Sequence, residues 1–510
     1  MAKSILKITV FITFMTFLSK IIGLIRDMKI ASVYGASEIT DAYNIALTVP
    51  NILYMVCASA IMITFIPNFY EVEEEEGKKG AFRFANKIIT ILLLISIVFY
   101  LISMLNAKAL VEIIAPNLSK ESFELTIKLT RITLINLIFT VIASVFSSIL
   151  RCNNKYLGIS LMPIFMNVPI IIFLFLNLWS NDIVLTTIVT TIGSMLQFII
   201  LIPELKGLKF KFRIQFKGYN DRVIDIFMKV LPILFGLAVS QISLIVDKNI
   251  GSSFTQGTIT SLEMSNKITS VIYGVLTSTV VTVFLPVMAK QFLNEDKNEW
   301  LETIKNIIIY MFIFTIPITI GAYILNKEII SLMYERGAFT QQNTNLVSAA
   351  FVGYLLQVPF LCIRDIIGQA FYSSKNTIIP TINGLVTVII NIVLTVILSK
   401  IYGVFGITLA TSISIILSSI LFLITLKKVY PILNIKDLII KSLKITLSSI
   451  IMGVGVYILY NQLFFITSNL IILVICTFIG ILIYFLTCKL LRVNEINNVY
   501  KLMKDRVQKK

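Results

Sequence analysis

The most constraining feature of the sequence is a pair of apolar helical stretches, between residues 16 and 68, that carry charges where a membrane helix is normally uncharged. The first stretch contains Lys20, Arg26 and Asp27, and the second contains Asp41. A Lys, Arg or Asp at the centre of a bilayer helix costs about 2.5 to 3.5 kcal/mol on insertion scales, whereas each Leu, Ile or Phe gains only about 0.3 to 0.6 kcal/mol. Three such charges would roughly cancel the apolar gain of a span, so their face cannot look at lipid.

Helical periodicity places the polar side chains of both stretches on narrow faces. At about 100° per residue, those of the first stretch fall in a sector of roughly 120°, and those of the second in a narrower stripe. The two sets are Thr16, Ser19, Lys20, Gly23, Arg26 and Asp27, and then Asp41, Asn44, Thr48, Asn51 and Ser59. Two neighbouring polar stripes indicate a shared wet interior, which is typical of a transport pathway.

The overall composition assigns the chain to the polytopic membrane proteins. Of its 510 residues, 57% are hydrophobic and 14% are charged, and the mean hydropathy is +0.91. The formal net charge of +17 would indicate nucleic-acid binding in a soluble protein, but here the Lys and Arg residues cluster in loops between apolar runs. Such clusters reflect membrane topology, so we expect no nucleic-acid partner.

Chemistry that needs a metal or a histidine base has little support in the sequence. The five cysteines form no CxxC pair, so neither a disulfide framework nor a zinc site is indicated. Histidine, the commonest general base and metal ligand, is absent. We therefore expect no cofactor, no metal and no enzymatic activity, and the residues do not identify a coupling ion.

Fourteen apolar runs are long enough to cross about 30 Å of hydrocarbon, which predicts an all-α polytopic membrane protein. They cover residues 5–32, 40–70, 84–105, 123–150, 157–178, 183–204, 223–250, 260–290, 302–325, 343–372, 379–398, 404–427, 439–461 and 468–491. Basic residues crowd the connections 206–222 and 427–444 and the tail 501–510, so by the positive-inside rule these segments and both termini are cytoplasmic. The acidic run 71–76 falls in the first cytoplasmic loop and is expected to be solvated.

An internal repeat relates the two halves of the chain. Shifting the sequence by 220 residues sets Asp27-Met28-Lys29-Ile30 against Asp247-Lys248-Asn249-Ile250. Each copy holds six spans, an even number, so both copies insert with the same orientation, and a substrate site is expected between them. The predicted division is a six-helix lobe over residues 1–215, a second six-helix lobe over 216–430, and two further helices with a basic cytoplasmic tail over 431–510.

The second half carries its own charges inside apolar runs. Asp247 lies in the seventh run, and Glu263 and Lys267 share one face of the eighth. In the tenth run, Arg364 and Asp365 are adjacent and point about 100° apart, so they need not neutralise each other. An ion pair to another helix and a ligand contact both stay open for Arg364.

The balance of these charges indicates the kind of ligand. Buried charges without partners are too costly, so some of them must pair. The set is Lys20, Arg26, Lys29, Lys248 and Lys267 against Asp27, Asp41, Asp247 and Glu263. A small surplus of cations favours an anionic ligand, and Arg suits the bidentate geometry of phosphate. The residues alone therefore predict a transporter whose partly cationic cavity suits a phosphorylated substrate.

Several short segments form a recognisable signature, namely SKIIGLIRD at 19–27, YGA at 34–36, TDAY at 40–43, PNIL at 50–53, FIP at 65–67 and FYSSKN at 371–376. These segments closely resemble the signature of the MurJ (MviN) lipid II flippase family. The resemblance runs over essentially the whole chain, including the arrangement of six, six and two spans. It implies a fold of the multidrug/oligosaccharidyl-lipid/polysaccharide exporter type, with two six-helix lobes around a central cavity.

The resemblance also implies an activity, namely export of the undecaprenyl-pyrophosphate-linked peptidoglycan precursor lipid II to the outer leaflet of the bacterial cytoplasmic membrane by alternating access. The implied partners are this glycan lipid, membrane lipid and, as an open option, cell-wall synthesis proteins. The final two spans resemble those that form a groove for the lipid tail. The candidate residues are Lys20, Arg26, Asp41 and Lys267 for substrate binding, and Asp27, Asp247, Glu263 and Arg364 for a gate or ion coupling.

Structural alternatives stay open for these candidates. For the three cations, the alternative to phosphate contact is an ion pair with Asp27, Asp41 or Glu263. Asp41 also fits the N-cap of the second span, because Thr-Asp opens that span. For Asp247, the alternatives are a gate residue and a helix-end partner of Lys248.

The chain departs from the family pattern in two places. The family commonly has Arg-Arg after Pro-Asn-Leu-Leu, whereas this chain has Tyr54-Met55, and the usual Glu-Gly-Ala is replaced by Ser59-Ala60-Ile61. At least one expected phosphate-binding charge is therefore missing. Export of another polyprenyl-pyrophosphate-linked oligosaccharide stays open, whereas export of cationic drugs is disfavoured because the cavity is not acidic. A membrane glycosyltransferase or acyltransferase is also disfavoured, because such an enzyme usually needs a catalytic histidine or a large outward loop and neither is evident in the sequence.

Overall fold

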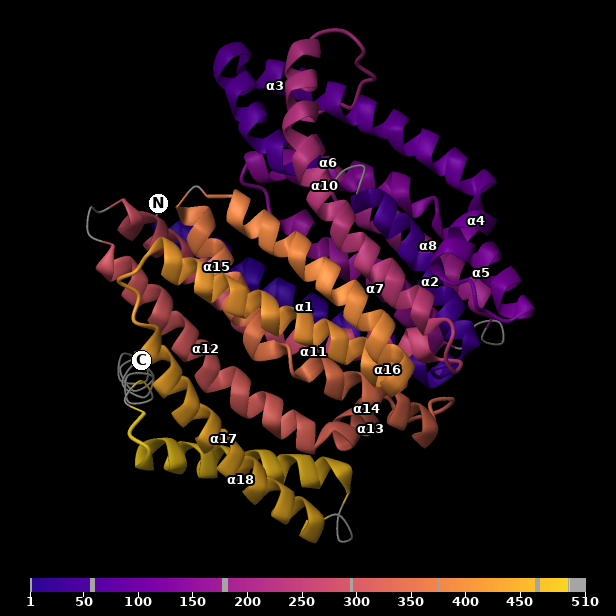
Figure 1. The fold of residues 1–510 in the computed structure, drawn as a ribbon. Helices are drawn as coiled ribbons and strands as arrows, with labels where there is room; N and C mark the ends of the chain where they lie inside the picture. The colour runs from indigo at the N-terminus through magenta and orange to yellow at the C-terminus, as the bar shows by residue number, and fades with distance from the viewer. Residues whose placement is uncertain are drawn as a thin grey trace. The chain divides into compact units, whose positions relative to one another are not determined.

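The computed structural model describes residues 2–55, 60–176, 182–293, 297–374, 376–463, 468–493 and 495. Over these residues the chain forms eighteen helices and no strand (Figure 1). The predicted all-α class is therefore confirmed. Ser59, one of the two departures from the family pattern, lies outside the described residues.

Eight helical segments among the described residues are long and apolar enough to cross a membrane. A ninth follows if α14 (Gln341–Leu355) and α15 (Val358–Ser373), which are bent by 41° at their junction, form one span. Two of the eight segments, Thr64–Leu105 and Ile378–Val429, each reach over two of the predicted runs. The chain is thus a multi-pass membrane protein, and the count of fourteen stays a prediction.

The chain divides into two compact units, and the first comprises Met1–Thr260 together with Arg336–Phe339. Its helices are α1 (Ala2–Tyr34), α2 (Glu38–Tyr54), α3 (Ala60–Leu105), α4 (Ala107–Ile114), α5 (Lys120–Thr133), α6 (Asn136–Cys152), α7 (Leu157–Phe175), α8 (Ile183–Ile199), α9 (Ile202–Gly207) and α10 (Asn220–Gly251). Packing of α3 against α6 buries an aromatic cluster that includes Phe65, Phe84 and Phe146. The lobe boundary at residues 215 and 216, drawn from the repeat, stays a prediction.

A tight turn places the two charged helices of the first unit in succession. Gly35 ends α1 in the left-handed region, with φ of 67°, a conformation that costs a glycine little. Ser37 then caps α2 in a capping box with Thr40, whose hydroxyl accepts from the Ser37 backbone N–H at 2.9 Å. Because the turn is only a few residues long, the end of α1 lies close to the start of α2, and the polar stripes of the two helices lie on either side of this turn.

The second unit comprises Ser261–Glu335 and Thr340–Lys510. Besides α14 and α15, its helices are α11 (Thr258–Phe292), which begins in the first unit, α12 (Asn298–Ile324), α13 (Asn326–Tyr334), α16 (Ile378–Val429), α17 (Ile435–Leu463) and α18 (Asn469–Leu490). Gly403, with φ of 60°, breaks α16 between two predicted runs. The fully buried Trp300 of α12 lies in the core, and α17 and α18 pack side by side (Figure 1).

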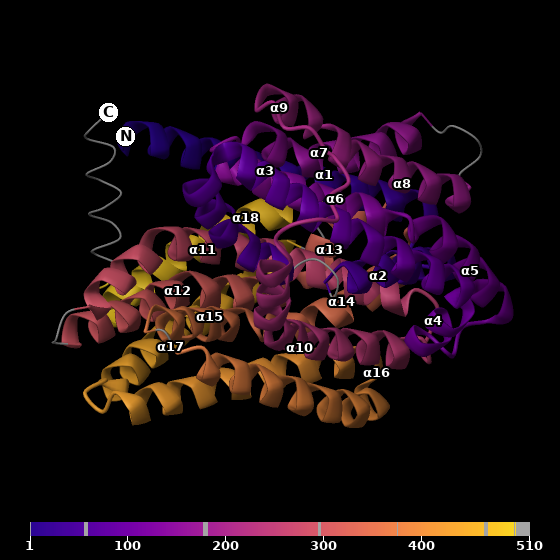
Figure 2. The same cartoon turned by 90° about the horizontal axis from the view of Figure 1, so that it is seen from above.

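The connection between α9 and α10 is a coil fastened to α3 (Figure 2). Asn86 of α3 donates to the Lys211 carbonyl at 3.1 Å, and its side-chain oxygen accepts from the Arg213 N–H at 3.2 Å. At the end of the coil, the Tyr219 hydroxyl donates to Glu76, and burial raises the pKa of Tyr219 to about 12, so it is protonated at neutral pH. Part of the acidic run 71–76 therefore binds this connection, a contact that the charge pattern did not predict.

Candidate functional site

Arg26 forms the centre of a compact polar cluster between α1 and α7. Its Nε and Nη2 atoms donate to Asp27 Oδ1 at 3.0 and 2.7 Å, and its Nη1 atom donates to Asn167 Oδ1 at 2.8 Å. The side chains of Arg26 and Asp27 are only 16% and 10% exposed. Of the two alternatives weighed for Arg26, pairing with Asp27 is therefore present in the structure, and contact with a phosphate stays a prediction.

Asn167 is a member of this cluster that the sequence analysis missed. It lies on α7 between Pro163 and Pro169, and its amide donates to the Pro163 carbonyl at 2.7 Å. This bond fixes the amide so that its oxygen points to the Arg26 guanidinium. The signal in the sequence was weak, namely a single Asn in an apolar helix, but a buried amide in a span usually has a specific partner.

Asp41 holds the first turn of another helix. Its carboxylate accepts from the N–H of Gly257 at 2.8 Å, and from the N–H and hydroxyl of Thr260, both at 2.7 Å. These groups belong to the start of α11, where unpaired N–H groups and the helix dipole both favour a negative charge. Asp41 therefore caps a helix, as the N-cap alternative expected, but that helix is α11. The N-cap residue of α2 is Ser37.

Further polar contacts surround the Asp41 carboxylate. The Asn44 amide donates to the Thr260 hydroxyl at 3.1 Å. One turn further along α2, the Thr48 hydroxyl accepts from the ammonium of Lys248, which is buried near the end of α10. Three members of the polar stripe predicted for α2, namely Asp41, Asn44 and Thr48, thus have partners at the end of α10 and the start of α11, whereas Asn51 is exposed.

The remaining predicted residues, Lys20, Asp247, Glu263 and Lys267, are half-buried. Lys20 lies on α1 nearly two turns before Arg26, and Asp247 lies on α10 beside Lys248. Glu263 and Lys267 lie one turn apart on α11, within the second unit. Their proposed roles stay predictions.

Arg364 lines a small polar cavity of about 160 Å³ in the second unit. The cavity is bounded by α15 and α16, and Asp365, Gln369 and Asn383 also line it. Neither Arg364 nor Asp365 makes an ion pair with any described residue, and both alternatives for Arg364 stay predictions.

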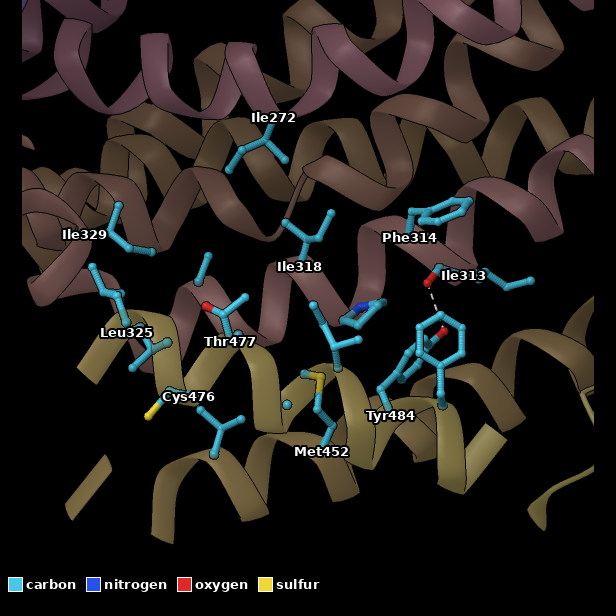
Figure 3. Close-up of a pocket in the computed structure, with 18 residues that line it drawn as sticks. Ile272, Ile313, Phe314, Ile318, Leu325, Ile329, Met452, Cys476, Thr477 and Tyr484 are labelled. Atoms are coloured by element: carbon cyan, nitrogen blue, oxygen red, sulfur yellow. Dashed lines mark hydrogen bonds between the residues drawn. The ribbon is translucent and has the colours of Figure 1, made fainter. Parts of the chain in front are cut away.

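A larger cavity lies among α12, α17 and α18 of the second unit, and its volume is about 490 Å³ (Figure 3). Its wall is almost wholly apolar, and Ile318, Leu325, Met452 and Tyr484 are among the residues that form it. The Tyr484 hydroxyl donates to the Ile313 carbonyl at 2.9 Å, and Thr477 contributes a second hydroxyl to the wall. Such a cavity suits a hydrocarbon chain and not a charged group.

The helical units and their polar and apolar sites define the class of protein. A solved multidrug resistance transporter of the MATE family and MOP superfamily, in an inward-facing conformation, shares the fold with a TM-score of 0.66, at 13% identity over 80% of this chain and 93% of that chain. The chain therefore has the exporter-type fold that the sequence predicted.

Stronger matches identify the family. The sequence model described as "Lipid II flippase MurJ" matches residues 30–484. The lipid II flippase MurJ of Thermosipho africanus is 32% identical over 484 residues, which cover 94% of this chain and 95% of the relative. A solved lipid II flippase MurJ in an inward closed conformation matches with a TM-score of 0.80 at 30% identity, over 96% of this chain and 100% of that chain. The chain belongs to the MurJ family.

Proposed function

We propose that this chain is a lipid II flippase, which moves the lipid-linked peptidoglycan precursor from the inner to the outer leaflet of the bacterial cytoplasmic membrane for cell-wall synthesis. The observation that carries the proposal is that a chain of the MurJ family keeps a buried, hydrogen-bonded arginine, Arg26, inside an apolar helix. A charge this deep in a span is expensive to maintain, which supports a role in transport.

The two kinds of site suit the two parts of such a substrate. Arg26 and Lys20 of the first unit would supply cations for the pyrophosphate, and Lys267 of the second unit stays a further candidate. Guanidinium suits this group best because it binds two oxygens at once. The apolar cavity among α12, α17 and α18 would take part of the polyprenyl tail. Arg26 would then have to exchange its contact with Asp27 for one with phosphate, and the carboxylate would be free to pair elsewhere or to take up a cation.

Asp41 would act as a latch in alternating access. The turns around residues 35–37 and 252–257 both lie on the outward side in the predicted topology, which has both termini in the cytoplasm. Bonds from Asp41 to Gly257 and Thr260 would therefore close the outward side, and release of the substrate to the outer leaflet would require them to break. Asp27, Asp247, Glu263 and Arg364 stay candidates for the gate or for ion coupling.

The proposal includes no cofactor and no catalytic step. A membrane transferase would need a base or a metal-binding carboxylate cluster, and the described residues contain no group of three or more His, Cys, Asp or Glu that could hold a metal. Export of another polyprenyl-pyrophosphate-linked oligosaccharide is the second candidate, and the replacement of the expected arginine by Tyr54 is the observation that favours it.

Complementation tests the proposal. The chain is expressed in a bacterium depleted of its own lipid II flippase, beside Arg26→Ala, Lys267→Ala and the control Lys128→Ala, which removes an exposed cation of α5. We expect rescue by the parent and the control and failure of Arg26→Ala and Lys267→Ala at equal membrane levels. A parent that inserts normally but does not rescue would favour another lipid-linked glycan.

A further inference from the structure

A second polar cavity lies within the first unit, where α2 ends at Tyr54. Its volume of about 320 Å³ is near the lower end of the range of about 300–1,000 Å³ that small-molecule sites occupy. Helices α2, α6, α7 and α8 contribute to its wall, and six of the ten lining residues are polar. The six are Tyr54, Thr140, Ser144, Ser147, Arg151 and Gln197. None of these ten described lining residues is acidic, and Arg151 is the one charged residue among them.

Most of this polarity comes from one face of α6. Thr140, Ser144, Ser147 and Arg151 follow one another at intervals of four, three and four residues, which is the spacing of a single helical stripe. The sequence analysis did not pick out this stripe, because three of its four members are hydroxyl residues that are common in apolar helices. Arg151 lies in the last turn of α6 and gives the stripe its charge.

Arg151 is available to a ligand. Its residue is exposed, and its guanidinium forms no hydrogen bond or ion pair with any residue that the structure describes. Tyr54 of α2 lines the same cavity as Arg151. The Ser144 and Ser147 hydroxyls now donate to backbone carbonyls of α6, each at 2.7 Å, but a hydroxyl can rotate to donate to another acceptor.

We propose that this cavity binds a phosphoryl group of the transported substrate, with Arg151 as its charged contact and Tyr54 and Gln197 as neutral donors. A cation with no carboxylate among the described lining residues favours an anion, and guanidinium binds two phosphate oxygens in a bidentate way. The residue that α2 contributes to the cavity, Tyr54, carries no charge. Arg151 thus brings to the cavity, from α6, a charge that α2 does not supply.

This inference rests on the proposed function only for the identity of the lipid that carries the phosphate. Anion binding rests on the cavity itself, so it can be measured with a simple probe. The first experiment is calorimetric titration of the purified full-length chain with inorganic pyrophosphate. The variants are Arg151→Ala, Arg151→Lys and the control Lys155→Ala, which removes an exposed cation four residues further on that does not line the cavity.

We expect Arg151→Ala to weaken pyrophosphate binding about tenfold or more, because a hydrogen-bonded pair of charged groups is lost. Arg151→Lys should bind pyrophosphate more tightly than Arg151→Ala but more weakly than the parent, since it keeps the charge but not the bidentate geometry. Lys155→Ala should bind pyrophosphate like the parent. Equal binding by Arg151→Ala and the parent, an equal loss in Lys155→Ala, or no binding by the parent would overturn the proposal.

A relocation variant provides the sharper test. Tyr54→Arg is combined with Arg151→Ala, which moves the guanidinium from α6 to α2 within the same cavity. Restored pyrophosphate binding in this double variant is the expected result, and failure to restore it in a well-folded double variant counts against a shared cavity. In the complementation assay, rescue by the parent together with full activity of Arg151→Ala would contradict this inference but support the flippase function. Pyrophosphate binding through Arg151 by a parent that fails to rescue would support this inference but contradict the flippase function.

Discussion

The Asp41 carboxylate should control how often the first turn of α11 opens. In Asp41→Asn, the side chain keeps one oxygen for Thr260 but loses the charge and turns an amide toward a backbone N–H or hydroxyl that needs an acceptor. A hydrogen bond to a charged group contributes about 1.5 to 3 kcal/mol, and a leftover buried donor costs a similar amount. We therefore expect a loss of about 2 to 3 kcal/mol of local stability.

Hydrogen exchange measures this loss directly, because the Gly257 and Thr260 amides are the groups that Asp41 protects. If exchange proceeds by local opening, about 2 to 3 kcal/mol corresponds to roughly 30- to 150-fold faster exchange of these amides. The assay is hydrogen–deuterium exchange with mass spectrometry on peptides that cover residues 252–262, at fixed pH and temperature.

Asp182→Asn is the matched control for this prediction. Asp182 caps α8 by accepting from the Val184 N–H at 2.8 Å, and Asn caps a helix about as well as Asp. It should leave exchange at residues 252–262 unchanged. Parental protection of these peptides in Asp41→Asn would refute the assignment of Asp41 as the cap of α11.

Four further substitutions test other parts of the structure. Gly257→Ala should cost at least about 2 kcal/mol and lower the melting temperature, because φ is +84° and the new Cβ would lie 2.3 Å from the Ala36 carbonyl oxygen; a parental melting temperature would contradict this. Lys305→Met should cost about 1 to 2 kcal/mol in thermal stability, since the buried ammonium pairs with Glu302 at 2.7 Å and Asp437 at 3.0 Å, although Lys441 would still pair with Asp437. Arg83→Ala, which breaks an exposed pair with Glu76, should change stability by less than about 1 kcal/mol and serves as the contrast. Gly321→Leu should fill part of the apolar cavity of α12, α17 and α18 without a clash, because a Cβ there meets nothing within 4 Å. We expect this variant to have normal thermal stability and reduced lipid transport. Full transport would argue against a lipid tail in this cavity.

The sequence predicted the helices and the residues of the charged stripes well, because both follow from local periodicity. Lys20, Arg26 and Asp27 belong to one helix, so their common face is fixed by about 100° per residue. The contact between Arg26 and Asp27 is also local. The fold class followed from the length of the apolar runs and from the resemblance of short motifs to a known family.

Partners that lie far along the chain could not be predicted in the same way. Asp41 binds Gly257 and Thr260, which lie more than two hundred residues away in the sequence. No local sequence pattern indicates that α11 is capped by a residue of another helix. Asn167 meets Arg26 only because the helix carrying it packs against α1. The hydroxyl stripe that ends in Arg151 was overlooked for a related reason, since its meaning depends on the cavity that three other helices complete.

The most direct test of the proposed function is translocation by the purified chain in proteoliposomes. Lipid II with a fluorescent headgroup is incorporated into the vesicles, and the fraction exposed on the outer surface is followed by chemical quenching over time, for the parent and for Arg26→Ala. The same measurement is made with a polyprenyl-pyrophosphate that carries a different oligosaccharide. We expect the parent to equilibrate lipid II between the leaflets much faster than empty vesicles and faster than the other glycan lipid, and Arg26→Ala to be slow. Rapid movement of the other glycan lipid with no movement of lipid II would contradict the proposed function.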